Sequence, residues 1–340
     1  MSILNTVVRK GIPYMVACVS LTMVSCSSFS FYPSQTNPSN QQNLFIQPTS
    51  VAPLGPSLYG VAMLSTKQGW AVGARFDNQG AAQNGILLHF QNGKWTQVPL
   101  HVPLFAVSLI SQTDGWAVGL SGEMFHYNGN QWLARGSFTR TRSTLRSVFM
   151  VSSQDGWAVG DDGIILHYNG TTWTPMGTQP ANGATLHRVF MLSSHEGWMV
   201  GDFGKIFRYT GNVWTQIQSP TVTNLNGISM ISSSEGWAVG DQGTLLHYQN
   251  GTWKSIKSPT TNSLYAVSLL SPNEGWCVGA NGTILQYQNG VWTKETSTDA
   301  LTGDLHANVM ISAMEGWSVG QNDTILHYQN TRWKKEYGSG

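Results

Sequence analysis

The 340-residue chain carries little charge. Only 10% of its residues are Asp, Glu, Lys or Arg, against roughly 25% in an average soluble protein. The 18 basic and 17 acidic residues nearly cancel, so the formal net charge is +1. Without a basic excess the chain cannot supply the counterion-releasing surface of a nucleic-acid-binding protein. No stretch keeps a helical hydrophobic period for long, which excludes a helical bundle or coiled coil and leaves a turn-rich, all-β protein.

Cysteine is also scarce, with three residues in the chain. Cys18 and Cys26 lie in or directly after an apolar run that follows the basic pair Arg9-Lys10, which is the layout of a secretory signal. The sequence Met23-Val24-Ser25-Cys26 resembles a bacterial lipobox, so we expect a lipoprotein signal peptide over residues 1–25 and a lipid on Cys26. Cys18 is the alternative lipidation site. Beyond the signal only Cys277 remains, and no intrachain disulfide is expected.

Residues 26–57 form a second distinct segment, rich in Ser, Pro, Asn and Gln and free of charged residues. This composition predicts a flexible tether after the lipidated cysteine. Each acyl CH₂ buried in a bilayer contributes about 0.8 kcal/mol, so several chains hold a protein at a membrane. We therefore expect a membrane-anchored bacterial lipoprotein that faces the cell surface or the periplasm, outside the cytoplasm.

Tryptophan is abundant and periodic. Its 14 residues form seven pairs, and the second member follows the first by 16 residues in six of them. The first members each follow a glycine and are Trp70, Trp116, Trp157, Trp198, Trp237, Trp276 and Trp317; the second members are Trp95, Trp132, Trp173, Trp214, Trp253, Trp292 and Trp333. The first pair is wider because of an insertion between Ala74 and Asn84. Seven repeats thus account for every tryptophan.

Each repeat contains four short apolar runs separated by turn residues. In the third repeat they cover residues 145–152, 156–160, 164–169 and 173–176. Four antiparallel strands repeated about every 40 residues are typical of a β-propeller blade. We therefore predict an all-β, seven-bladed β-propeller over residues 58–337. A linear β-solenoid is the alternative, although its coils are usually shorter and need distinct caps.

The ring must close between the last and the first blade. The apolar patch Leu44-Phe45-Ile46 stands out in the tether, and Phe45 lies 13 residues before Leu58. The second tryptophan precedes the starting leucine of the next repeat by the same interval in three repeats. The patch could therefore add a strand to blade seven. Closure by packing of the two blade faces alone is the other possibility.

Three motifs carry a resemblance to known proteins. Gly-Trp-Ala-Val-Gly, then Gly-x-Ile-Leu-x-x-Tyr, then Asn-Gly-x-x-Trp is similar to the repeats of photosystem II assembly factors and, more widely, of Asp-box (BNR-type) propellers. The stretch from Asn169 to Trp173 resembles a degenerate Asp box with Asn in place of Asp. The resemblance covers residues 58–337. It implies a propeller fold and a role in protein–protein interaction or complex assembly, while the fold alone is a weak guide to function.

The loops differ between the two faces of the expected ring. If the strands of each repeat are labelled A to D, the A–B and C–D turns are nearly uniform, whereas the B–C loops and the D-to-A crossings vary in length. Variable loops on a fixed scaffold are where binding usually occurs. We therefore expect a protein partner on the face that carries these loops, called here the B–C/D–A face, and a monomeric protein.

Two sets of residues are the candidates for binding on this face. The residue after each starting leucine varies and is expected to ring the mouth of the channel: Tyr59, Phe105, Arg146, His187, Asn226, Tyr265 and His306. Five of the nine arginines cluster in the crossings of repeats two to four: Arg135, Arg140, Arg142, Arg146 and Arg188. Arginine pairs with carboxylates, so an acidic protein segment is a plausible ligand. Filling of gaps between blades and a solvated loop are the alternative interpretations.

Catalysis is not expected. Asp-box propellers include sialidase-like glycoside hydrolases, which need an arginine triad and a tyrosine nucleophile with acidic partners. Tyr59 and Tyr265 lie near the expected mouth, with Asp304 the nearest acid, and this is not a complete site. The chain has no zinc, phosphate-loop or nucleophile-elbow motif, and neither a metal nor a cofactor is expected. A carbohydrate-binding propeller or a glycoside hydrolase remains the alternative function.

Overall fold

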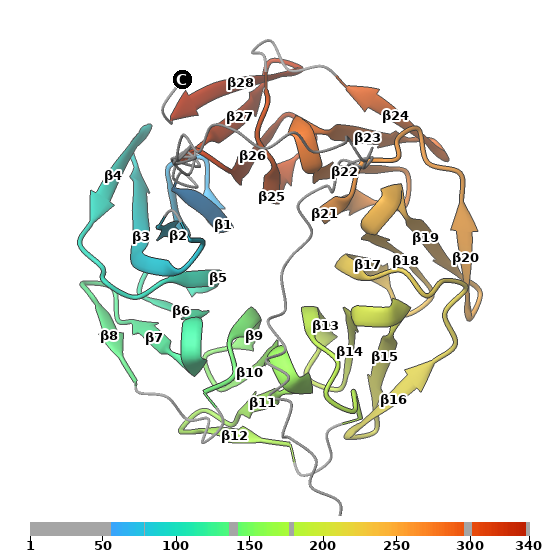
Figure 1. Cartoon of the computed structure of the whole chain (residues 1–340), viewed down its shortest axis with the longest axis horizontal. Helices are drawn as coiled ribbons and strands as arrows, with labels where there is room; N and C mark the ends of the chain where they lie inside the picture. Colours follow the sequence, from blue (N-terminus) through green and yellow to red (C-terminus); the bar gives the residue numbers. More distant parts are fainter. Residues whose placement is uncertain (1–55, 78, 136–141, 177–179, 296–300, 338–340) are drawn as a thin grey trace, which may run out of the picture. The chain divides into compact units, whose positions relative to one another are not determined.

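The computed structural model describes residues 56–77, 79–135, 142–176, 180–295 and 301–337. The chain divides into the units Met1–Thr49 and Ser50–Gly340, and the second contains all the described residues. Its strands form seven four-stranded antiparallel sheets, arranged as a ring (Figure 1). The predicted seven-bladed β-propeller is therefore confirmed. The predicted signal peptide, Cys26 and the patch at residues 44–46 lie outside the described residues.

The four strands of each blade follow one another in space as they do in sequence, from A at the centre of the ring to D at its rim (Figure 1). The A strands are β1 (Ser57–Ser65), β5 (Leu104–Ser111), β9 (Leu145–Ser152), β13 (Leu186–Ser193), β17 (Leu225–Ser232), β21 (Leu264–Ser271) and β25 (Leu305–Ser312). The B strands are β2 (Gln68–Phe76), β6 (Asp114–Gly119), β10 (Asp155–Gly160), β14 (Glu196–Gly201), β18 (Glu235–Gly240), β22 (Glu274–Gly279) and β26 (Glu315–Gly320).

The outer half of each blade completes the sheet. The C strands are β3 (Ala82–Gln91), β7 (Met124–Tyr127), β11 (Ile165–Tyr168), β15 (Ile206–Thr210), β19 (Leu245–Gln249), β23 (Ile284–Gln288) and β27 (Ile325–Gln329). The D strands are β4 (Lys94–Val98), β8 (Trp132–Ala134), β12 (Trp173–Pro175), β16 (Val213–Ile217), β20 (Thr252–Ile256), β24 (Val291–Glu295) and β28 (Arg332–Tyr337). The insertion in repeat one lengthens the β2–β3 hairpin.

Five short 3-10 turns, η1 to η5, connect strands B and C in blades two to six. They are η1 (Leu120–Gly122), η2 (Asp161–Gly163), η3 (Asp202–Gly204), η4 (Asp241–Gly243) and η5 (Ala280–Gly282). The middle residue of each turn has a positive φ, between 54° and 59°. In the described part of the chain, no helix has the length and apolar character needed to cross a membrane.

The uniform turns are explained by local hydrogen bonds. In each A–B turn a serine Oγ accepts a bond from the backbone N–H two residues later, as from Gln154 to Ser152 at 3.1 Å. In the C–D turn of blade one, Asn92 and Gly93 have φ values of 51° and 81°. Two successive positive φ values are the type I′ geometry that matches the twist of a hairpin and favours Asn-Gly. These turns therefore have a structural role.

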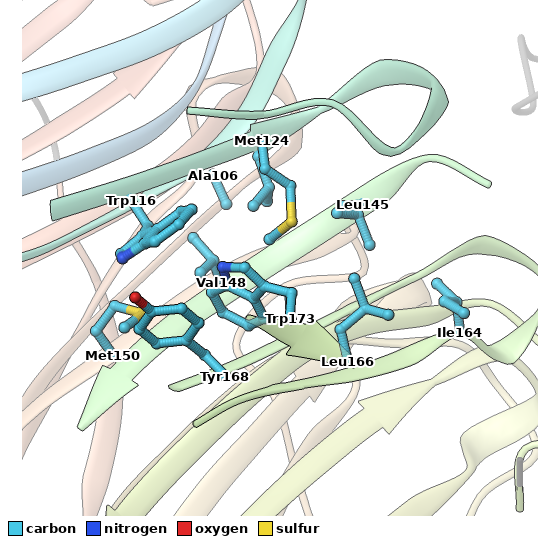
Figure 2. Packing of buried hydrophobic residues seen from close by; sticks show 12 residues of the cluster. Ala106, Trp116, Met124, Leu145, Val148, Met150, Ile164, Leu166, Tyr168 and Trp173 are labelled. Carbon is cyan, nitrogen blue, oxygen red and sulfur yellow. The ribbon is translucent and has the colours of Figure 1, made fainter. Parts of the chain in front are cut away.

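The hydrophobic core lies between neighbouring blades. In the cluster shared by blades two and three, the Trp116 ring lies 5.1 Å from Tyr168 and 5.3 Å from Trp173, centroid to centroid (Figure 2). Leu166 and Met124 fill the same cluster and are fully buried. Both faces of every sheet are thus covered by apolar side chains, which explains why so few positions are left for charge.

Specific polar contacts accompany the closure of the ring between blades seven and one. All four strands of blade seven come from repeat seven. The Glu336 carboxylate on β28 accepts hydrogen bonds from Trp95 Nε1 at 3.2 Å and Trp317 Nε1 at 3.3 Å, so it joins the two blades. The Asp323 backbone N–H also donates to the Pro56 carbonyl at 3.1 Å. Within the described residues, face packing and these contacts close the ring.

Candidate binding face

The structure brings the predicted mouth residues together at the centre of the ring. Four of them, from blades six, seven, one and two, form a continuous chain of rings. Tyr265 lies 5.5 Å from His306, His306 stacks on Tyr59 at 4.7 Å, and Tyr59 meets Phe105 edge-on at 5.3 Å. All four side chains are half-buried. One side of the centre is therefore aromatic.

The other three mouth residues, from blades three to five, are polar, and each bonds the Asp that opens the B–C turn of its own blade. The Arg146 Nε lies 2.5 Å from Asp161 Oδ1. The His187 Nε2 lies 2.8 Å from Asp202 Oδ1. The Asn226 Nδ2 donates to Asp241 Oδ1 at 2.9 Å. The recurring aspartates thus hold the mouth side chains in place, in addition to forming the turns.

Sequence reasoning missed this pairing, although the sequence contained a signal for it. The residue 15 positions after the mouth residue is Asp in blades three to five, where it follows Arg146, His187 and Asn226. In the aromatic half the same position carries no Asp: Tyr59, Phe105, Tyr265 and His306 are followed by Ala74 within β2, Leu120, Ala280 and Gln321. The centre of the ring therefore has a polar half and an aromatic half that differ at two linked positions.

Burial affects the pKa of several of these groups. Desolvation lowers the pKa of the His306 imidazole to about 4, despite the nearby Asp304 carboxylate. Desolvation raises the pKa of Tyr59 and Tyr265, and the Asp304 carboxylate raises the pKa of Tyr265 further. The Tyr265 hydroxyl donates to Asp304 Oδ2 at 3.3 Å. The four rings of this half are therefore uncharged at pH 7.

The predicted arginine cluster is spread over the width of the blades. Arg135 follows the outermost strand of blade two, and its Nη2 lies 3.4 Å from His126 Nδ1. Arg146 and Arg188 lie on the innermost strands β9 and β13. Arg142 is exposed just before β9, and Arg140 lies outside the described residues. In the described part of the chain, neither Arg142 nor Arg188 has a carboxylate within ion-pair distance.

Phe203 is a surface feature that sequence reasoning missed. It occupies the middle of turn η3 with a φ of 59°, and 68% of its side-chain surface is exposed. Blades two, three, five, six and seven place Ser121, Asp162, Gln242, Asn281 and Asn322 at this point. Small or polar residues tolerate a left-handed backbone better than a bulky aromatic does. The signal was visible in the sequence as an aromatic in a column of turn residues.

A second exposed apolar residue lies on the next loop. Val222, in the crossing from blade four to blade five, is 84% exposed. The crossing packs so closely on turn η3 that Gly204 has no room for a side chain beside Thr221. The Phe203 N–H also donates to Asn224 Oδ1 on the same crossing, at 3.0 Å. Phe203 and Val222 are therefore presented by a fixed pair of loops on the B–C/D–A face.

The chain is similar to known proteins in sequence and in fold. Residues 248–336 match the family model described as photosynthesis system II assembly factor YCF48. The resemblance to this family is confirmed. A solved structure of YCF48 bound to D1 peptide superimposes with a TM-score of 0.67 at 17% identity, covering 83% of this chain and 95% of that one. YCF48 from Cyanidioschyzon merolae gives 0.65 at 13% identity, covering 82% and 98%.

An enzyme shares the same fold. Virginiamycin B lyase from Staphylococcus aureus superimposes with a TM-score of 0.67 at 16% identity, covering 80% of this chain and 94% of the lyase. No curated protein sequence matches the chain. At these identities the solved structures establish the fold alone, because one fold hosts unrelated activities.

Proposed function

We propose that this protein is a non-catalytic scaffold that binds a protein partner through the B–C/D–A face, for complex assembly at a membrane. The observation that carries the proposal is Phe203, an exposed aromatic held in an unfavourable backbone conformation. Holding a bulky side chain in this conformation costs on the order of 1–2 kcal/mol. The exposed ring adds no burial in the core that could offset this cost. Strained residues cluster at ligand-binding sites, and exposed aromatics are enriched among residues that dominate interfaces.

An apolar pair and two arginines indicate the chemistry of the partner. Phe203 and Val222 supply an apolar anchor, which suits a hydrophobic pocket on a protein surface. Arg142 and Arg188 lack acidic partners among the described residues, and desolvation lowers the pKa of Arg188. A carboxylate on the partner would satisfy these guanidinium groups. A protein surface with an apolar pocket and flanking acidic residues therefore fits this face, and the YCF48 structure with D1 peptide supports a protein partner.

A catalytic role has little support in the described residues. The Tyr265–Asp304 contact is the closest approach to a tyrosine nucleophile with an acidic partner. However, the raised pKa of Tyr265 opposes ionisation of that hydroxyl. Arg146 is already engaged by Asp161, and no group of three or more metal-ligating side chains occurs in the part of the chain that the structure covers. The lyase of the same fold keeps the enzymatic alternative open to experiment.

The binding face is tested by recovery of the partner. The lipid-free protein is used to capture partners from membranes of the source organism, and the captured protein is then purified and titrated directly. We expect Phe203→Ser with Val222→Ser to weaken binding at least tenfold, since an interface anchor contributes about 2 kcal/mol or more. Met314→Ser is the matched control, because Met314 is 54% exposed in an A–B turn. Equal affinity of both variants would contradict the proposal.

Membrane anchoring is tested separately. We expect the full chain to incorporate a radiolabelled fatty acid and to fractionate with membranes. Cys26→Ser should abolish both, whereas Cys18→Ser should leave both unchanged. Labelling that persists in Cys26→Ser and disappears in Cys18→Ser would move the anchor to the first cysteine. If the wild type stays soluble and carries no label, the membrane anchor is contradicted. That result does not bear on the protein-binding face.

A further inference from the structure

The outer part of the junction between blades one and two differs from the repeat pattern. In four blades a C-strand histidine pairs through Nε2 with an acid on strand B, at 2.5–2.8 Å. The acids concerned are Asp114, Asp155, Glu235 and Glu315. In blade one the acid is replaced by Gln68, and His89 Nε2 is buried with no hydrogen-bond partner among the described residues. Desolvation lowers the pKa of His89, so its ring is neutral at pH 7.

A cavity lies beside Gln68 and His89. It has a volume of about 640 Å³ and lies between strands β3 and β4 of blade one and β7 and β8 of blade two. This volume is within the range of pockets that hold small ligands. Trp132 lines the cavity and is half-exposed, whereas the other six second tryptophans are buried. Trp132 packs on Trp70 and Tyr127 as its counterparts pack in the other junctions, but part of its indole also faces the cavity.

The chemistry of the lining is unusual. Apart from the neutral His89 imidazole, the described lining holds no acidic or basic side chain. Five amide side chains do so: Gln68, Gln91, Gln112, Asn130 and Gln131. Each amide offers two donors and an acceptor without charge. A phosphate, a carboxylate or an ammonium group would find no opposite charge here, and a purely apolar molecule would leave the amides unsatisfied.

We propose that this cavity binds a neutral carbohydrate. The apolar C–H face of a sugar ring would lie against the Trp132 indole, which has the flat hydrophobic surface that such a face needs. The hydroxyl groups would exchange hydrogen bonds with the surrounding amides. His89 also lines the cavity, and a sugar hydroxyl that reaches its unpartnered Nε2 would satisfy it. This site is on the rim of the ring and is independent of the proposed protein-binding face.

The test uses neutral oligosaccharides as probes. The lipid-free protein is screened on an array of uncharged glycans, and the strongest hits are titrated by calorimetry. We expect binding by the wild type and a loss of at least tenfold in Trp132→Leu. Trp292→Leu is the matched control, since Trp292 holds the same position in blade six but is buried. It should lower the melting temperature and leave glycan affinity unchanged.

A second variant separates the cavity from general stability. Gln68→Glu restores the acid of the other blades, should pair with His89, and should leave the melting temperature unchanged or higher. We expect it to weaken glycan binding at least tenfold, because it occupies His89 and places a charge in the cavity. Absence of neutral-glycan binding by the wild type, or full binding by both Trp132→Leu and Gln68→Glu, would overturn the proposal. Phe203→Ser should retain glycan binding, so failure of the two proposals can be told apart.

Discussion

The junction between blades three and four and the junction between blades seven and one are made from the same repeat but are held differently. In the first, Trp157 packs 4.8 Å from Tyr209 and 5.4 Å from Trp214, and its Nε1 has no hydrogen-bond partner among the described residues. In the second, Trp317 packs 5.6 Å from Phe90 and donates its Nε1 hydrogen to Glu336. Apolar packing is common to both. The Val189 backbone N–H donates to Ser147 Oγ across the first at 3.2 Å, whereas a carboxylate that bridges two indoles occurs in the second.

The difference follows from chain connectivity. Blade three continues into blade four through a crossing, so the chain itself keeps the two faces close together. Blades one and seven contain the first and last repeats, and no crossing joins them. Within the part of the chain that the structure describes, side chains and backbone groups maintain their contact, and Glu336, Arg75 and Asp323 supply polar contacts there. Exceptions to a repeat thus mark the places with an additional task.

The largest expected effect concerns the packing that both junctions share. Trp157→Ala should lower the free energy of unfolding by about 3–5 kcal/mol, because it empties a fully buried site between two blades. Trp317→Ala should cost at least as much, since it also leaves Glu336 with one indole donor fewer. Urea denaturation followed by circular dichroism measures both. A cost below about 1 kcal/mol for either would show that the junctions do not depend on these tryptophans.

The next effect concerns the bridge that only the closing junction has. Glu336→Ala should lower the free energy of unfolding by about 1–2 kcal/mol, since two buried indole N–H groups lose their acceptor. Glu295→Ala is the matched control, because Glu295 follows the second tryptophan of blade six by the same three positions. It should change stability by less than about 0.5 kcal/mol. Equal costs for the two variants would remove the distinction between the junctions.

The closing junction should also depend on pH. Burial alone would raise the pKa of Glu336, but hydrogen bonds from His327, Trp95 and Trp317 outweigh it and hold the pKa below its usual 4.5. Burial would lower the pKa of His327, but Glu336 and Glu315 raise it above 6.5. The Glu336 contribution is complete above pH 4.5 and is lost on further acidification. The His327 contribution is complete below pH 6.5 and is lost as the pH rises.

The pair should therefore stabilise the ring most between about pH 4.5 and 6.5, the interval in which both contributions are complete. Thermal melting of the wild type and of Glu336→Gln across this range checks the expectation. The difference between the two melting temperatures should be largest inside the window and should shrink on either side of it. A difference that does not change with pH would show that the bridge is not ionic.

The smallest expected effect belongs to an exposed contact of the same junction. Arg75 Nη2 lies 3.7 Å from Asp323 Oδ2, and the arginine side chain is 45% exposed. Exposed ion pairs usually contribute about 0–1 kcal/mol and weaken with salt. Arg75→Ala should therefore lower the free energy of unfolding by less than about 1 kcal/mol, and the loss should vanish at high salt. A larger loss that resists salt would place Arg75 among the main determinants of closure.

Much of the fold was predictable because it is encoded seven times. The paired tryptophans fix the repeat length, and Asn-Gly pairs such as Asn92-Gly93 mark a hairpin that the structure reproduces with two positive φ values. The grouping of the mouth residues at the centre followed from their place at the start of strand A. In each case the pattern depends on residues close together in the sequence, and each of the seven repeats predicts the same blade structure.

The remaining features depend on residues that occur once. Glu336 and Glu295 are equivalent in sequence, yet Glu336 accepts bonds from two indoles. Glu295 pairs directly with Ile284, whereas a register shift between β27 and β28 leaves Glu336 without a paired residue. The pairing of mouth residues with turn aspartates, the bulky Phe203 and the missing acid at Gln68 could have been found by comparing the repeats column by column. The distances between these residues and their partners could not be predicted from the sequence, because they depend on contacts between distant parts of the chain.

The tryptophan contacts run in one direction around the ring. Each first tryptophan packs against the tyrosine or phenylalanine of the following blade, as Trp116 does with Tyr168 and Trp317 does with Phe90. Every blade therefore has a donor face and an acceptor face, like subunits in a head-to-tail assembly that closes on itself. In such an assembly the position of the opening is arbitrary. A circular permutant that joins blade seven to blade one and begins at another crossing keeps every pair of faces, and should fold to the same ring.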